Sequence, residues 1–95
     1  MFVVLLRFAD NKGQAGPFMD DHKDWIKRGF DDGVFLMAGS LQPNAGGAIL
    51  AHNTSPSDFR ARVNDDPFVK HHVVNAEILE ITPSRADERL KCLLG

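Results

Sequence analysis

Two hydrophobic periodicities alternate along the chain. Residues 2–8 form an apolar run rich in β-branched side chains, which is typical of a strand buried on both faces of a sheet. From Phe18 to Phe30 the apolar residues recur at helical spacing, with acidic residues early, basic residues late and Asp32-Gly33 at the end. Similar signals downstream complete the pattern. Together they predict strands at 2–8, 34–38, 46–52 and 73–81, a helix at 18–30, and a helix that begins at Ser55 and ends at Asp66-Pro67. The glycines and proline of 10–17 predict a loop before the first helix.

Capping signals mark two helix starts in the second half of the chain. Residues 55–58 (Ser-Pro-Ser-Asp) combine an N-cap serine, a proline suited to the first helical position and an acid at capping-box spacing. Residues 84–87 repeat that spacing after Thr82-Pro83 breaks the last strand. We therefore expect a short C-terminal helix at about 84–94, with one apolar stripe formed by Ala86, Leu90 and Leu93.

The order of these elements predicts the fold class. Strand, helix, strand, strand, helix, strand is the βαββαβ pattern of the ferredoxin-like α+β sandwich, with both helices on one face of a four-stranded antiparallel sheet. The last strand carries apolar residues on both faces, because Ala76 and Ile78 point one way while Leu79 and Ile81 point the other. The second face needs a cover, and a second copy of the chain is the simplest one. The sequence therefore predicts a homodimer.

Composition narrows the classes of partner. The chain has 95 residues and a net charge of −2 without a basic cluster, so nucleic acid is not an expected partner. The apolar N-terminus is too short to span a bilayer and lacks the features of a signal peptide, so we expect no membrane association and a cytoplasmic location. Cys92 is the one cysteine, which excludes an internal disulfide, and we interpret it as a packing residue.

His22 is the first candidate for chemistry. It shares a helical face with Trp25 and Ile26 that should turn toward the sheet, so we expect a partly buried imidazole that needs a hydrogen-bond partner. An imidazole titrates near neutral pH, which suits a proton carrier. The alternatives are a structural histidine or one exposed at the start of the helix, and spacing alone does not decide between them.

Asp66 is the second candidate. Pro67 keeps the backbone of Asp66 out of the helical region and fixes a local turn. A carboxylate held there can orient the imidazole of His22 in one tautomer, as in a catalytic dyad. Aspartate before proline is also a common turn former, and that interpretation stays open.

Small residues surround the turn between the two middle strands. We place Gly39 and Ser40 in a turn region at 39–44, where free N–H groups and a hydroxyl can hold a substrate oxygen. Gly46 and Gly47 are better explained by hairpin geometry. Adjacent residues on a strand point to opposite faces, so we expect no metal site at His71-His72.

Several of these segments together resemble the YCII-related family. The resemblance runs from about residue 2 to about residue 82, and the chain is accordingly interpreted as a single YCII-related domain at 1–95. The segments that carry it are residues 1–7 (Met-Phe-Val-Val-Leu-Leu-Arg), His22-x-x-Trp25, 33–39 (Gly-Val-Phe-Leu-Met-Ala-Gly), 46–50 (Gly-Gly-Ala-Ile-Leu) and 66–69 (Asp-Pro-Phe-Val).

The resemblance implies a dimeric α+β barrel, in which two sheets pack face to face, with His22 and Asp66 as the catalytic pair beside a pocket. A few relatives have an assigned activity, such as removal of chloride from a chlorinated hydroxyquinone, and muconolactone isomerases share the barrel. This chain departs from a common family pattern at Ser40, where proline often follows the glycine, and at Asp20-Asp21, where Pro-Ala is frequent. These departures leave the expected fold unchanged but argue against transferring a relative's substrate to this chain.

Two functions compete. The first is a lyase or isomerase that needs no cofactor and acts on a small organic acid or phenol. His22 would move the proton, Asp66 would orient it, and Ser40 with the backbone near Gly39 would hold an oxygen that gains negative charge. The second is a noncatalytic module that binds a small ligand in the same pocket or uses its barrel for assembly.

Overall fold

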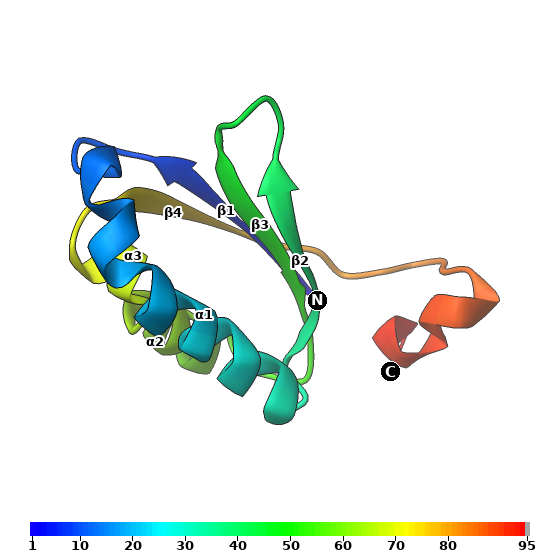
Figure 1. The fold of residues 1–95 in the computed structure, drawn as a ribbon. Helices are drawn as coiled ribbons and strands as arrows, with labels where there is room; N and C mark the ends of the chain where they lie inside the picture. The colour runs from blue at the N-terminus through cyan, green and yellow to red at the C-terminus, as the bar shows by residue number, and fades with distance from the viewer. Residues whose placement is uncertain (95) are drawn as a thin grey trace.

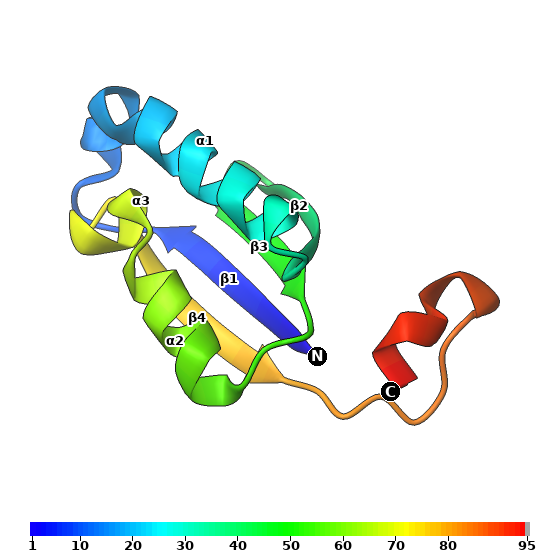
Figure 2. The same ribbon diagram turned by 90° about the horizontal axis from the view of Figure 1, so that it is seen from below.

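A four-stranded antiparallel sheet organises the computed structural model, which describes residues 1–94. Its strand order is β2-β3-β1-β4, and the three α-helices cover one face of it (Figures 1 and 2). This arrangement confirms the predicted α+β class and the ferredoxin-like order. The strands are β1 (Phe2–Phe8), β2 (Phe35–Leu41), β3 (Gly46–Ala51) and β4 (Val74–Glu80), and the helices are α1 (Ala15–Asp31), α2 (Pro56–Asn64) and α3 (Pro67–Lys70).

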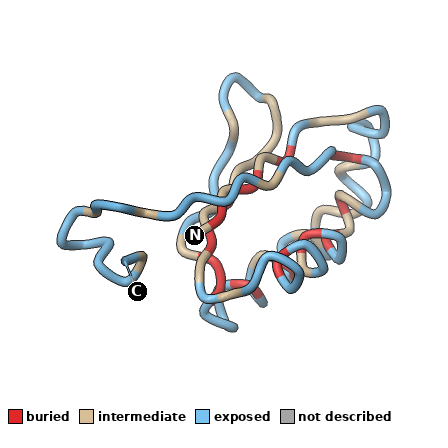
Figure 3. Tube along the Cα trace, turned by 180° about the vertical axis from the view of Figure 1, so that it is seen from behind, coloured by how far each residue is buried: buried red, intermediate tan, exposed pale blue. Residues whose placement is uncertain are grey.

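The core lies between the central strand β1 and the helices. Phe2, Val4 and Leu6 alternate along β1 and are buried on the helix-facing side. Phe59 of α2 stacks on Phe2 with ring centroids 4.9 Å apart, and Trp25 of α1 is 2 % exposed. Figure 3 shows the buried positions on the sheet and the helices and the exposed ones along the C-terminal segment.

Helix α2 begins where its capping signal predicts. The Ser55 hydroxyl accepts a hydrogen bond from the backbone N–H of Asp58 at 3.1 Å, and Pro56 occupies the first helical position.

No helix among residues 1–94 is both long and apolar enough to cross a membrane.

Helix α1 begins at Ala15 rather than at Phe18, so the prediction of a loop up to residue 17 is wrong. A 3-10 turn, η1 (Lys12–Gln14), precedes it. The misleading signal was the glycine and proline content of this segment. Pro17 is compatible with the first turn of a helix, because the N–H that it lacks has no partner inside the helix there.

Strand β2 continues to Leu41, so the prediction that Gly39 and Ser40 lie in a turn is also wrong. Gly39 pairs with Ala48 and Ser40 pairs with Gly47 of β3. These small residues have weak strand preference by themselves, and pairing with β3 decides their conformation.

The C-terminal segment is a 3-10 helix, η2 (Glu88–Leu94), instead of the α-helix expected at about 84–94. It begins four residues later than the capping-box spacing suggested, and Asp87 rather than Ser84 accepts a backbone N–H, that of Arg89, at 3.0 Å. Leu90 is 42 % exposed, and Cys92 is exposed, so its interpretation as a packing residue is wrong. Figure 1 shows this segment extending away from the sheet. None of its residues is buried, whereas most α-helices are stabilised by packing an apolar face against the rest of the protein.

The face of the sheet opposite the helices is apolar and uncovered (Figure 1). On this face Val3 of β1 lies between Leu50 of β3 and Leu79 of β4. Leu79 is 42 % exposed and Met37, beside Leu50, is 50 % exposed. The Arg7–Glu77 ion pair, 2.6 Å long, borders the same apolar surface.

Gly29 allows α1 to approach the sheet closely. It is buried on α1, and a Cβ atom there would overlap the ring of Phe35 on β2. That ring is itself held edge-on against Trp25, with centroids 5.1 Å apart, so it has little freedom to move.

We expect Gly29→Ala to lower the free energy of unfolding by about 1–3 kcal/mol through overpacking. Alanine is otherwise the better helix former by roughly 1 kcal/mol, so the sign of the change tests the contact. Gly16→Ala on the same helix is the matched control, because a Cβ there meets nothing within 4 Å. Urea denaturation measures both variants, and a Gly29→Ala protein as stable as the control would contradict this account.

Candidate active site

Asp66 joins α2 to α3 and is fully buried. Its backbone is extended, with φ −61° and ψ 124°, which is what the following Pro67 requires. Its Oδ1 accepts a hydrogen bond from the backbone N–H of Phe68 at 3.0 Å and so caps α3. The predicted turn is present, whereas the short helix that it starts was not predicted.

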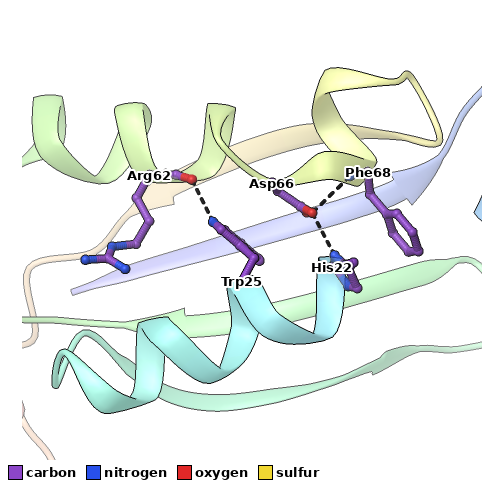
Figure 4. A network of polar contacts seen from close by, with 5 residues as sticks. All are labelled: His22, Trp25, Arg62, Asp66 and Phe68. Atoms are coloured by element: carbon purple, nitrogen blue, oxygen red, sulfur yellow. Dashed lines mark hydrogen bonds and ion pairs between the residues drawn. The ribbon is translucent and has the colours of Figure 1, made fainter. Parts of the chain in front are cut away.

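His22 reaches this carboxylate from α1. Its Nδ1 lies 2.7 Å from Asp66 Oδ1, with the His22 side chain 13 % exposed and the Asp66 side chain 0 % exposed (Figure 4). An ionised carboxylate can only accept, and Oδ1 also accepts the N–H of Phe68, so beside the carboxylate form of Asp66 the hydrogen of this bond lies on His22 Nδ1. In the neutral ring the lone pair is therefore on Nε2, the nitrogen that a general base uses.

Aromatic side chains fix the plane of the imidazole. Phe68 stacks on His22 with centroids 3.9 Å apart and an interplanar angle of 4°, and Trp25 lies at 5.9 Å. The Nε1–H of Trp25 donates to the backbone carbonyl of Arg62 at 2.9 Å (Figure 4). Residues one helical turn apart on α1 thus hold the α2–α3 segment, and the ring has little room to rotate.

The second oxygen of Asp66, Oδ2, is buried and has no hydrogen-bond partner within residues 1–94. Burial of an unpaired carboxylate oxygen is destabilising. A buried polar atom without a partner calls for an explanation, and a catalytic role is one of the recognised ones. Here the other oxygen of the same carboxylate is hydrogen-bonded to His22.

His22 lines a cavity of about 380 Å³ between α1 and the end of the sheet that carries the β2–β3 hairpin. Asp66 does not line this cavity, so it contacts the imidazole from behind and leaves Nε2 as the ring nitrogen available to a bound molecule. The apolar part of the wall consists of Leu6, Phe8, Met19, Ile26, Ala38, Ala48, Ile49, Phe68 and Val74.

Gly39 and Ser40 line the same cavity from β2. Ser40 pairs with Gly47, which in turn pairs with Leu6, so Ser40 lies on the helix-facing side of the sheet. The structure therefore places all four predicted site residues at or directly behind one cavity, although Gly39 and Ser40 come from a strand instead of a turn. Their roles in chemistry stay predictions.

Gly46 has a structural task in the hairpin. Its φ is +135°, and a Cβ there would overlap the carbonyl oxygen of Leu6. The structure therefore requires glycine at the start of β3 because this strand passes close to β1, while the positive φ lies where the chain leaves the β2–β3 turn.

Two polar residues of the cavity wall, Lys23 and Asn44, were missed. Lys23 follows His22 directly, which was an available signal, whereas Asn44 comes to the cavity through the hairpin alone.

His71 and His72 precede β4 and do not lie on a strand, so the prediction that their side chains alternate between the two faces of a strand was wrong. His71 ends α3 and stacks on Phe18 at 4.0 Å, and His72 has a φ of 58°. Within residues 1–94 no three His, Cys, Asp or Glu side chains are grouped to hold a metal ion.

No protein-family model matches the chain, and no curated protein matches it in sequence. Its structure is similar to the solved 5-chloro-2-hydroxyhydroquinone dehydrochlorinase from Burkholderia phenoliruptrix AC1100, in complex with 2,5-dihydroxybenzoquinone. The TM-score is 0.68 and the sequence identity 12 %, over 85 % of this chain and 93 % of that one. At this identity the likeness establishes the fold, and the site must be argued from its own geometry.

Asp66→Ala should lower the free energy of unfolding by about 2 kcal/mol, because it removes an N-cap and leaves His22 Nδ1–H without an acceptor. Asp65→Ala is the matched control, because Asp65 is the neighbouring aspartate and is exposed. Its ion pair, between Oδ1 and Lys70 Nζ at 3.8 Å, is also exposed. Chemical denaturation compares the two. An equal loss of unfolding free energy in the two variants would show that the hydrogen bonds of the buried carboxylate do not stabilise the fold.

Proposed function

We propose that this chain belongs to the YCII-related family and is an enzyme that transfers a proton on a small organic acid or phenol, as a lyase or an isomerase. The hydrogen bond of 2.7 Å between His22 Nδ1 and Asp66 Oδ1, made behind a cavity that His22 lines, is the observation that carries this proposal. The fold shared with a dehydrochlorinase that binds a quinone supports it. The cytoplasmic location stays a prediction from the sequence.

In this mechanism His22 Nε2 takes a proton from the substrate, and the ring becomes an imidazolium. Asp66 stabilises the new charge through the hydrogen bond that it already makes to Nδ1. Return of the proton to another atom of the substrate gives isomerisation, and its transfer to a departing group gives elimination. The stacked Phe68 keeps the ring in one orientation through both steps.

Removal of that proton leaves negative charge on a substrate oxygen, which needs a hydrogen-bond donor. The Ser40 hydroxyl, on the opposite wall of the cavity from α1, is the proposed donor. Gly39 lines the cavity next to Ser40 through its backbone, because a side chain at this position would point to the other face of the sheet.

The size and lining of the cavity fit a single-ring compound. Its volume of about 380 Å³ is within the range of small-molecule sites, and most of its wall is apolar. A planar ring can lie against Met19 and Ile26 while its oxygens meet the polar groups.

His22→Asn is the sharpest test of the proton transfer. An asparagine amide can replace Nδ1–H as the donor to Asp66 but offers no basic nitrogen in place of Nε2. Candidate substrates are single-ring acids and phenols, including chlorinated hydroquinones, for which release of chloride is measured. For the one that the wild-type protein turns over, we expect kcat to fall on the order of 10²–10⁴-fold with little loss of stability.

His71→Ala is the control for that experiment, because His71 stacks on Phe18 and does not line the cavity. Unchanged turnover in His22→Asn would rule out this mechanism. Mass spectrometry of the incubated wild-type protein separates the two functions, since a retained, unaltered ligand without product identifies a binding module.

We further propose that a second copy covers the open face of the sheet and completes a dimeric α+β barrel. Met37 and Leu79, about half exposed on that face, continue an apolar surface through Val3 and Leu50. An uncovered patch of this kind is rare on a monomer, and a two-fold axis lets the same patch cover itself.

Light scattering should give the mass of two chains of 10.5 kDa each, and Leu79→Glu should give the mass of one. A charge at Leu79 would be buried without a partner in the dimer, whereas it is solvated in the monomer. Arg60→Glu, on the exposed side of α2, is the control and should stay dimeric. A wild-type mass of one chain would remove the barrel from the proposal.

A further inference from the structure

The cavity contains a second ionisable residue, Lys23, besides His22. Met19, Lys23 and Ile26 follow one another along α1 at spacings of four and three residues, so one stripe of the helix faces the cavity. Lys23 is exposed, and it therefore lines the cavity on its solvent side.

Lys23 forms no ion pair within residues 1–94, whereas other lysines do. Lys27, one turn further along α1, pairs with Asp31 at 2.7 Å, and Lys91 pairs with Glu88 at 2.6 Å. The ammonium of Lys23 is therefore available to a ligand.

The charge of the cavity wall differs in sign from that of the chain. The chain has 13 acidic and 11 basic residues and a net charge of −2, yet the cavity lining contains no aspartate or glutamate. Asp20, Asp21 and Asp24 surround Lys23 in sequence, but none of them lines the cavity. A cleft with one sign of charge and apolar walls attracts ligands of the opposite sign.

We infer that Lys23 makes the cavity selective for anions and that its ligand is a single-ring carboxylate or phenolate whose charged oxygen lies near Lys23. The ring then lies along Met19 and Ile26, and a second polar substituent reaches Ser40 or Asn44 on the hairpin wall. The inference rests on the proposed function for treating this cavity as the active site, and it narrows the substrate to an anion.

Benzoate and benzamide are suitable probes, because they share a ring and differ in charge. Their binding is followed by NMR through the ring signals of His22. Wild-type protein should bind benzoate about fivefold to tenfold more tightly than benzamide. Lys23→Met should bring the two affinities within about twofold of each other, and added salt should weaken the wild-type preference.

Lys27→Met is the matched control, because Lys27 lies on the same helix as Lys23 but does not line the cavity. It should keep the benzoate preference. Equal binding of the two probes by the wild-type protein, a preference that survives in Lys23→Met, or no response of His22 to either probe would each overturn the inference.

This readout separates the inference from the proposed enzyme. A preference that depends on Lys23, without turnover of any candidate, upholds anion selectivity and removes the catalysis. Turnover that depends on His22 and keeps the same kcat/KM for anionic substrates in Lys23→Met upholds the catalysis and removes the role of Lys23.

Discussion

One carboxylate oxygen, Oδ1 of Asp66, connects the parts of this molecule that matter for its site. It accepts the N–H of Phe68, which starts α3, and the Nδ1–H of His22, which comes from α1. The first bond fixes where the chain turns after α2, and the second decides which tautomer the imidazole adopts. Since both bonds end on the same atom, the turn and the tautomer cannot change independently.

The surroundings of that oxygen turn a local cap into a rigid site. Phe68, positioned by the cap, stacks on the imidazole at 3.9 Å, and Trp25 binds the carbonyl of Arg62 one helical turn away. The carboxylate itself is sealed from solvent and keeps Oδ2 unpaired. Burial strengthens the hydrogen bond to the histidine, and it also imposes the desolvation cost of the unpaired oxygen. In the proposed mechanism, this balance between stability and preorganisation is what the pair of His22 and Asp66 would need.

The sheet supplies the other wall of the cavity and the small residues that leave it open. Gly46 permits the backbone of β3 to pass close to Leu6, and Gly47, which pairs with Ser40 on the helix-facing side, adds no side chain to the cavity wall. The cavity therefore exists because the hairpin is built from residues with little volume, opposite a helix that presents larger side chains. Basic groups come from the helix wall and neutral polar groups from the hairpin wall.

The sequence by itself determined the strands, the two main helices, their α+β order and the turn at Asp66-Pro67, because periodicity, capping and proline geometry act over a few residues. It also placed His22 on the inward face of α1, since Trp25 and Ile26 share that face. Where local signals were weak they misled. The sequence predicts a loop at 10–17, a turn at Gly39-Ser40 and a C-terminal helix at about 84–94, where the structure has the start of α1, the end of β2 and a 3-10 helix. Pairing with β3 decided the conformation of Gly39 and Ser40, and no residue of η2 is buried.

Only the tertiary structure decided that His22 and Asp66, 44 residues apart, meet through Nδ1 and Oδ1. It also decided that the carboxylate lies behind the cavity and that Lys23 and Asn44 line it. The reason is physical: spacing along a helix sets the direction of a side chain, but the partner it meets depends on how α1 packs against the α2–α3 segment and the sheet. That packing is a property of the whole fold.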